Sequence, residues 1–199
     1  MALVMTTMAL TLLTGLGTVL VVGTMMETAV AAAHRRSVEV FYAADAAVEF
    51  AIRDLAARAD WDAVLTGAEW SAFTDGPPEG IRDAGTAIVD LTRASAEVEA
   101  LLAARAVPPD GAARLYAYGR FDWLVPADAA PPPLYVCVWV APRAADEAEG
   151  EERPVRELYL AARAFGTTGG QRTLLVALAR PLAPEERPSL QVRAWEELQ

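Results

Sequence analysis

The 199-residue chain contains one cysteine, one histidine and no lysine, and its first 26 residues carry no charge. A single cysteine cannot form a disulfide within the chain, and one histidine cannot complete a usual structural zinc site. The 17 basic residues are all arginines, a compositional bias that carries no functional weight. Core packing must therefore hold the fold, and no metal or cofactor is expected.

Basic clusters are also scarce, because the largest is Arg35–Arg36 in a chain with 27 acidic residues and a net charge of −10. Proteins that bind nucleic acids need a basic surface that follows the phosphates. We therefore expect no nucleic-acid partner. The length fits one sizeable domain with a long additional element.

The uncharged run Met1–Met26 predicts a membrane span. As a helix it would be about 39 Å long, against a hydrocarbon core of about 30 Å. A cleaved secretory signal would need a charged first region and a shorter apolar core. Threonines and glycines within the run are small enough to let helices approach closely in lipid.

Helical patterning continues beyond Glu27, because apolar residues recur at helical spacing as far as Leu55 and no proline or glycine interrupts residues 24–65. We predict one helix of about sixty residues, about 90 Å long. Its apolar half covers 1–26 and its amphipathic half 27–60. A C-terminal domain is expected over 61–199.

The sequence resembles PilX-type minor pilins of the type IV pilus, within the pilin and pseudopilin superfamily. Three segments near the start carry the resemblance: Ala2–Val22, Glu27–Arg36 and FYAADAAVEFA at Phe41–Ala51. Leu158–Arg180 is similar to the last hairpin of the family. The resemblance implies an α+β, pilin-like fold, in which the long helix packs on a small antiparallel β-sheet.

The resemblance also implies processing at Met1. Family members carry a short basic leader, which a prepilin peptidase removes just before the residue that aligns with Met1, and the new amino group is methylated. A literal positive-inside count, based on His34, Arg35 and Arg36, would place the domain in the cytoplasm. A basic leader would reverse that orientation and place the domain in the periplasm.

Four further positions are implicated in assembly by the resemblance. Major pilins carry a glutamate at the fifth mature position, where it pairs with the terminal ammonium of a neighbouring subunit, but this chain has Met5. Glu27 aligns with an acidic position of the family, although it is equally a simple interfacial carboxylate. Phe41 and Asp45 belong to the aromatic and Ala-Ala-acid-Ala-Ala block.

The C-terminal segment predicts a loop at Asp75–Gly80 and a helix at Thr92–Ala106 with Ser95 as its N-cap. The apolar run LYVCVWV indicates a central strand, covered on one face by the long helix. GTTGG at Gly166–Gly170 predicts a hairpin through positive φ angles rather than a phosphate loop. The predicted strands are Ala113–Trp123, Leu134–Val140, Val155–Phe165, Arg172–Arg180 and Leu190–Trp195.

No set of residues with catalytic spacing is found in the sequence, so we do not expect an enzyme. Cys137 lies within an apolar strand and is expected to be an inert core thiol. His34 is interpreted as a juxtamembrane polar residue. The acidic run Ala144–Arg153 lacks the glycine and final glutamate of an EF-hand and is expected to be a solvated loop. The five tryptophans are assigned to core and rim.

Together these features predict a minor pilin that joins the priming and tip complex of a type IV pilus. It would be stored in the inner membrane with a periplasmic domain and then lie at the pilus tip. Its expected partners are other minor pilins, the major pilin and a tip adhesin. Two alternatives remain: a minor pseudopilin of type II secretion, or a solitary membrane-anchored domain that binds a ligand.

Overall fold

The computed structural model describes residues 1–85, 87–105, 113–126, 128, 131–143, 155–181 and 190–198. The chain divides into two units, Met1–Val38 and Glu39–Gln199. The first unit is purely helical, and the second contains the sheet domain. The predicted acidic run Ala144–Arg153 lies outside the described residues.

Helix α1 spans Ala2–Ala57 without interruption, as predicted. Its buried residues begin at Val40 and recur at steps of three or four, which is the period of one helical face. They are Val40, Ala43, Ala44, Ala47, Val48, Ala51 and Leu55. This pattern makes α1 one layer of the sheet domain over its last five turns.

The end of α1 is held by two side chains, one close to it in the sequence and one distant. Trp61 Nε1 donates to the carbonyl of Leu55 at 3.1 Å, and Arg180 Nη1 donates to the carbonyl of Arg58 at 2.6 Å. These bonds satisfy carbonyls that a helix end leaves without partners. A short helix α2, Trp61–Thr66, follows with Asp60 as its N-cap.

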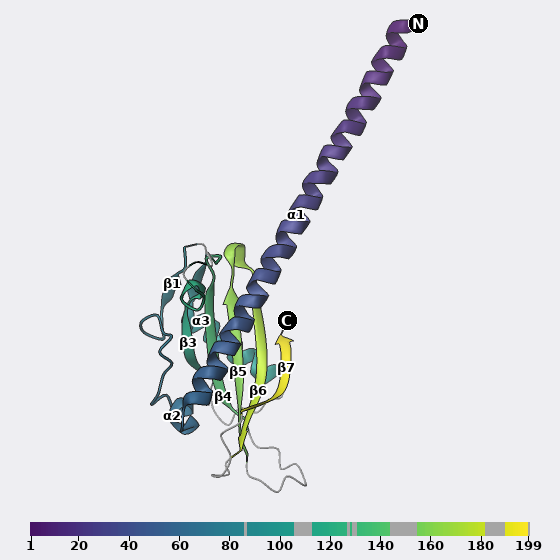
Figure 1. Cartoon of the computed structure of the whole chain (residues 1–199). Coiled ribbons are helices and arrows are strands. Elements are labelled where there is room, and N and C mark those ends of the chain that lie inside the picture. The colour runs from purple at the N-terminus through teal and green to yellow at the C-terminus, as the bar shows by residue number, and fades with distance from the viewer. Residues whose placement is uncertain are drawn as a thin grey trace. The chain divides into compact units, whose positions relative to one another are not determined.

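Five strands form one antiparallel sheet in the order β3-β4-β5-β6-β7. Each strand pairs with its sequence neighbour, so the sheet is a simple meander (Figure 1). The bounds agree with the predicted strands to within a few residues and are identical for β5. They are β3 Arg114–Arg120, β4 Tyr135–Pro142, β5 Val155–Phe165, β6 Gln171–Pro181 and β7 Gln191–Leu198.

Strand β4 shows how the two faces of the sheet are divided. Val136, Val138 and Val140 lie in the core that includes α1, whereas Cys137 and Trp139 lie in the core that includes helix α3. A strand buried on both faces reads as a continuous apolar run, which explains LYVCVWV. The long helix covers one face as predicted, and α3 adds a second layer that the sequence did not indicate.

Helix α3 spans Leu91–Ala104, and its N-cap is Asp90 rather than Ser95. Asp90 Oδ1 accepts from the amides of Thr92 and Arg93, at 3.0 and 3.1 Å. Ser95 instead lies inside the helix, where its hydroxyl donates to the carbonyl of Leu91. The predicted cap was wrong because the helix begins with the buried residue Leu91. A two-stranded ribbon precedes it, β1 Ile81–Asp83 and β2 Ile88–Asp90.

The predicted hairpin joins β5 to β6 through a 3₁₀ turn at Thr167–Gly169. Only Gly169 in this turn has a positive φ, at 80°, so the expectation that several glycines would adopt one was too broad. Gly166 is required for another reason. A Cβ at Gly166 would lie 2.5 Å from Cγ2 of Val40 on α1.

Replacing Gly166 with alanine is therefore expected to destabilise the domain by about 1–3 kcal/mol, because the new methyl overpacks the contact between hairpin and helix. Thermal unfolding of the full chain in detergent measures this loss. Gly170→Ala is the matched control, because its φ is −65° and the nearest atom to a new Cβ is 3.9 Å away. The double variant Gly166→Ala/Val40→Ala should recover part of the loss. Equal stability of both single variants would contradict the close approach.

Candidate functional site

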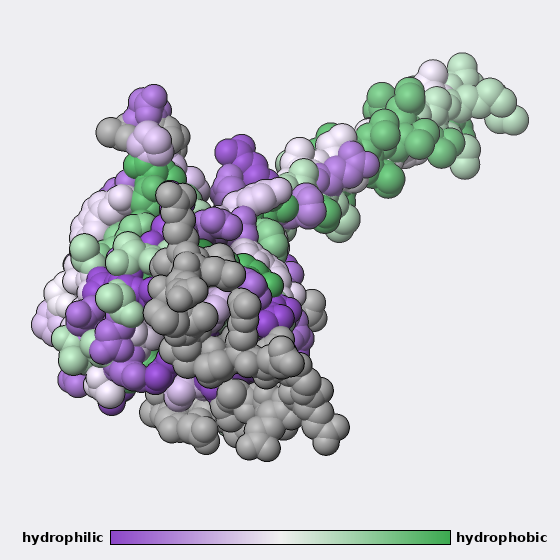
Figure 2. Space-filling view, turned by 60° about the horizontal axis from the view of Figure 1, so that its bottom comes forward, coloured by the Kyte–Doolittle hydropathy of each residue, from purple (hydrophilic) through white to green (hydrophobic). Residues whose placement is uncertain are grey.

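The first candidate surface is the apolar part of α1. Every residue from Met1 to Arg36 is exposed, including large side chains such as Leu12 at 67% and Met5 at 72%. Figure 2 shows hydrophobic residues along the first part of this helix and hydrophilic residues further along it. Among the described residues, α1 is the one helix long and apolar enough to cross a membrane.

The threonines of this helix satisfy their own hydroxyl groups. Seven of them donate to carbonyls three or four residues earlier in the same helix: Thr6, Thr7, Thr11, Thr14, Thr18, Thr24 and Thr28. Thr14 Oγ1, for example, lies 2.7 Å from the carbonyl of Leu10. Such internal bonds allow hydroxyls to lie in lipid or between apolar helices without unmatched donors.

The five assembly and processing residues predicted from the sequence fall into two groups. Met1, Met5 and Glu27 lie on the exposed helix of the first unit. Phe41 and Asp45 belong to the second unit and are half-buried there. Phe41 packs against the core between α1 and the sheet, called here the α1-side core. Its ring meets that of Tyr42 edge to face, with the ring centroids 5.7 Å apart.

The alanine block around Asp45 has a clear packing role. Ala43, Ala44, Ala47 and Ala51 are at most 1% exposed and lie within the α1-side core. Their small side chains allow the helix backbone to approach the sheet closely. Asp45 lies at a half-buried position of the same segment. The block is therefore the docking face of the helix on its own domain.

Sequence reasoning missed a polar cluster that fixes α1 to the sheet. Tyr116 Oη on β3 donates to Asp54 Oδ2 at 2.6 Å, and Arg58 lies 3.5 Å from Asp54 and 2.8 Å from Glu69. Burial, followed by the hydrogen bond to Asp54, raises the pKa of Tyr116, so the phenol remains a donor at neutral pH. Asp54 and Tyr116 are 62 residues apart, so no local motif indicates the pair.

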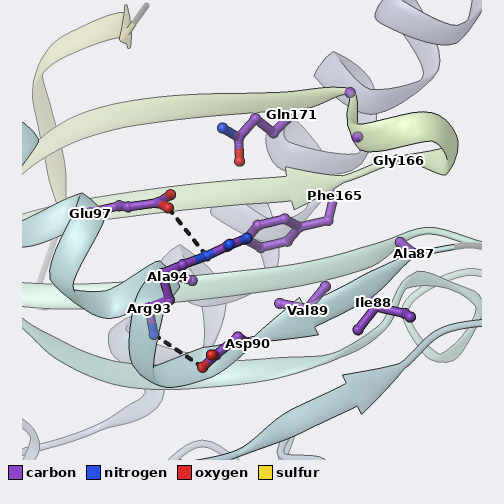
Figure 3. A pocket seen from close by; sticks show the side chains of 12 residues that line it. Ala87, Ile88, Val89, Asp90, Arg93, Ala94, Glu97, Phe165, Gly166 and Gln171 are labelled. Atoms are coloured by element: carbon purple, nitrogen blue, oxygen red, sulfur yellow. Dashed lines mark hydrogen bonds and ion pairs between the residues drawn. The ribbon is translucent and has the colours of Figure 1, made fainter.

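A cavity of about 410 Å³ lies between the start of α3, strand β2 and the hairpin of β5 and β6 (Figure 3). Arg93 extends along it beside Phe165, with its Nε 3.4 Å from Glu97 Oε1. Asp90 also borders the cavity, but its carboxylate caps α3. The charged groups here are thus already bonded within the domain.

A second cavity, of about 680 Å³, lies between α3 and the neighbouring ends of β5, β6 and β7. Arg163 borders it and is only 2% exposed. Its Nη1 donates to Glu97 Oε2 at 2.7 Å and its Nε to Thr173 Oγ1 at 2.8 Å. These bonds brace α3 against the sheet.

The residues considered for chemistry occupy structural positions. Cys137 is fully buried in β4, and burial raises the pKa of its thiol. His34 is exposed on α1. Trp61 and Trp139 are buried, whereas the remaining three tryptophans are 41–53% exposed, as expected for core and rim. Within the described residues, no three His, Cys, Asp or Glu side chains form a metal-binding group.

The described residues form an α+β fold in which part of α1 packs on a five-stranded antiparallel sheet, and α1 is long and apolar enough to cross a membrane. Residues 1–49 match the model of the family described as PilX N-terminal. This segment is therefore similar to the N-terminal segment of PilX-type pilins. The match covers the apolar part of α1 and most of its alanine block. No curated protein and no solved structure matches the chain.

Because Cys137 is buried and its thiol pKa is raised, we expect it to react with a thiol reagent only when the domain unfolds. The measurement is the labelling rate of the full chain across a urea series. Trp70→Cys is the control, since Trp70 is 43% exposed and a cysteine there should add one fast equivalent. Fast labelling of the native wild-type chain would contradict an inert core thiol.

Proposed function

We propose that this chain is a minor pilin that enters the priming and tip complex of a type IV pilus and promotes pilus assembly. Before assembly it is stored in the inner membrane, with its C-terminal domain in the periplasm. Its partners are other minor pilins, the major pilin and a tip adhesin. No catalytic step and no nucleic-acid partner are part of this function.

The observation that supports a tip position is the absence of a carboxylate from the whole apolar half of α1. Met5 occupies the position where the family resemblance places glutamate in major pilins, and Glu27 is the first acidic residue. In a filament core, the terminal ammonium of a neighbouring subunit would face this apolar segment without a counter-ion. Burying an unpaired ion costs several kcal/mol, which disfavours repeated insertion into a shaft.

A second observation that supports an assembly role is the attachment of the domain's own part of α1 to the sheet. The alanine face, the Tyr116–Asp54 bond and the Arg180 contact fix residues 39–57 of α1 to the sheet. A force applied to residues 39–57 would reach the sheet through these contacts. The described domain therefore suits a subunit that is extracted from a membrane and inserted into an assembly.

Processing is the first test. N-terminal and intact-mass analysis of the native chain is compared between a strain with and a strain without the prepilin peptidase. We expect a methylated Met1 only in the presence of the peptidase. An unprocessed N-terminus that is identical in both strains would leave a simple membrane-anchored domain and would remove the pilin function.

The second test uses Met5→Glu in a strain that lacks the chromosomal gene. The wild-type chain should restore surface pili and remain far less abundant than the major pilin in sheared filaments. Met5→Glu supplies a counter-ion, so we expect its ratio to the major pilin to rise about tenfold, corresponding to about 1.4 kcal/mol. Mass spectrometry of sheared filaments measures the ratio.

Met5→Gln is the matched control, because it adds polarity at the same position without charge and should leave the ratio unchanged. Met8→Glu places the carboxylate about one turn further along and should not raise it. Wild-type abundance similar to that of the major pilin would contradict a tip position, and so would full pilus numbers in the deletion strain.

A further inference from the structure

The two edges of the five-stranded sheet are treated differently by the chain. Along β3, the segment Ser71–Thr74 lies against the outer edge: the Ser71 amide donates to the Tyr116 carbonyl at 3.4 Å, and the Tyr118 amide donates to the Phe73 carbonyl at 2.9 Å. Thr74 and Tyr118 form a parallel bridge. At the opposite edge, β7 is the last strand of the sheet among the residues that the structure describes.

Strand β7 is also the most exposed strand of this sheet. Its residues Gln191–Glu196 are all exposed, and they include two large apolar side chains, Val192 at 49% and Trp195 at 41%. In register, Trp195 lies opposite Val176 and Val192 opposite Leu178. Both partners belong to the α1-side core, so Val192 and Trp195 lie on the same face of the sheet as α1.

Helix α1 does not extend its cover to this strand. The α1-side core takes residues from β3, β4, β5 and β6, and none of the described residues of β7 belongs to it. An exposed edge strand presents a row of backbone groups for pairing, and apolar side chains beside it add contact area. Tryptophan is among the residues that contribute most to protein interfaces.

The two carboxylates at the end of β7 do not block pairing at this edge, because both are bonded within the domain. Charged side chains on an edge strand usually discourage pairing. Here Glu196 is bonded to Arg105 of the α3 end, and Glu197 lies 2.8 Å from Arg172 of β6. Both carboxylates are therefore engaged by residues of the same domain. The register shift near Arg193 leaves Ala194–Leu198 as a regular run.

A second copy of this chain does not fit the edge. Helix α1 runs in the direction of β6, because Val40 meets Gly166 near the start of β6 and Arg58 meets Arg180 near its end. Strand β7 runs the opposite way. Antiparallel pairing of two β7 strands would make the α1 segments 39–57 of the two domains run in opposite directions, whereas subunits of the proposed pilus are expected to run in the same direction.

Pairing of β7 with β3 of another copy is excluded because the outer edge of β3 is already covered. Residues Ser71–Thr74 already occupy the β3 backbone there. Strands β3 and β7 also run in the same direction, so copies with the same orientation could pair these edges only in a parallel arrangement. The net charge of −10 adds repulsion between copies.

We infer that β7 is the docking edge for an extended strand of a different pilus subunit, which adds antiparallel to β7 and places apolar side chains against Val192 and Trp195. This inference rests on the proposed function and specifies how the tip complex is held together. The added strand runs in the direction of α1, and its subunit is less acidic than this chain.

Amide hydrogen exchange tests the backbone part of the inference. The full chain in detergent is measured alone and after co-expression with each pilin-type subunit of the same organism in turn. We expect β7 amides that exchange quickly in the chain alone to slow by about tenfold or more in one complex. An association that protects other elements and leaves β7 unchanged would overturn the inference while keeping the pilin function.

Side-chain variants test the apolar part. Trp195→Ala should reduce recovery of the partner subunit by about tenfold to thirtyfold, because tryptophan is enriched among the few residues that carry most of the binding energy of an interface. Trp70→Ala is the matched control, since Trp70 has a similar exposed fraction and lies outside the sheet. Slow labelling of Cys137 verifies that both variants are folded.

The remaining outcomes are equally decisive. Equal recovery with both variants would overturn the inference. Protection, in the isolated monomer, of the β7 amides that face away from β6 would overturn it as well. Protection that increases with the concentration of the chain alone would assign the edge to a second copy and contradict a different subunit. Failure to associate with any pilus subunit, together with peptidase-independent processing, would instead reject the proposed function.

Discussion

The structure depends on the close approach of helix α1 to the sheet. Ala43, Ala44, Ala47 and Ala51 keep the helix surface flat, and the absence of a Cβ at Gly166 avoids a collision with Val40. The resulting core reaches from β3 to β6. A helix covers only a limited width of a sheet, so the fifth strand falls outside this cover, and the exposure of β7 follows from the same contact that stabilises the domain.

Elements with long patterns could be predicted from the sequence, whereas short ones could not. The period of α1 persists over many turns. Strand β5 alternates poorly, but a glycine-rich turn follows it, and its predicted bounds, Val155–Phe165, are those observed. Helix α2 and strands β1 and β2 have three to six residues, too few for a period to emerge. The wrong cap at Ser95 arose because Asp90 and Ser95 both suit an N-cap, and only the burial of Leu91 decides between them.

The features of the candidate surface also divide into those that the sequence predicts and those that it does not. The exposed apolar half of α1, including Met5 and Glu27, follows directly from hydropathy along the sequence. The contacts that fix the helix to the domain could not be predicted, because Asp54 meets Tyr116 and Arg180 meets Arg58 across 62 and 122 residues. The packing of α3 on the second face of the sheet could not be predicted either. Helix α3 packs with Trp139 and Cys137, which in the sequence are only part of a long apolar strand.

The apolar half of α1 can attach the chain to an assembly, but it provides little selectivity for a particular partner. The threonines of α1 bond to their own helix, and residues 1–26 contain no charged side chain that could pair with a selected neighbour. Packing between such helices relies on van der Waals contact, which many apolar surfaces provide. In the proposed complex, selection of neighbours therefore falls to the domain, where backbone pairing requires a strand of defined direction and register. Of the two sheet edges, the chain itself covers β3, and β7 offers that pairing.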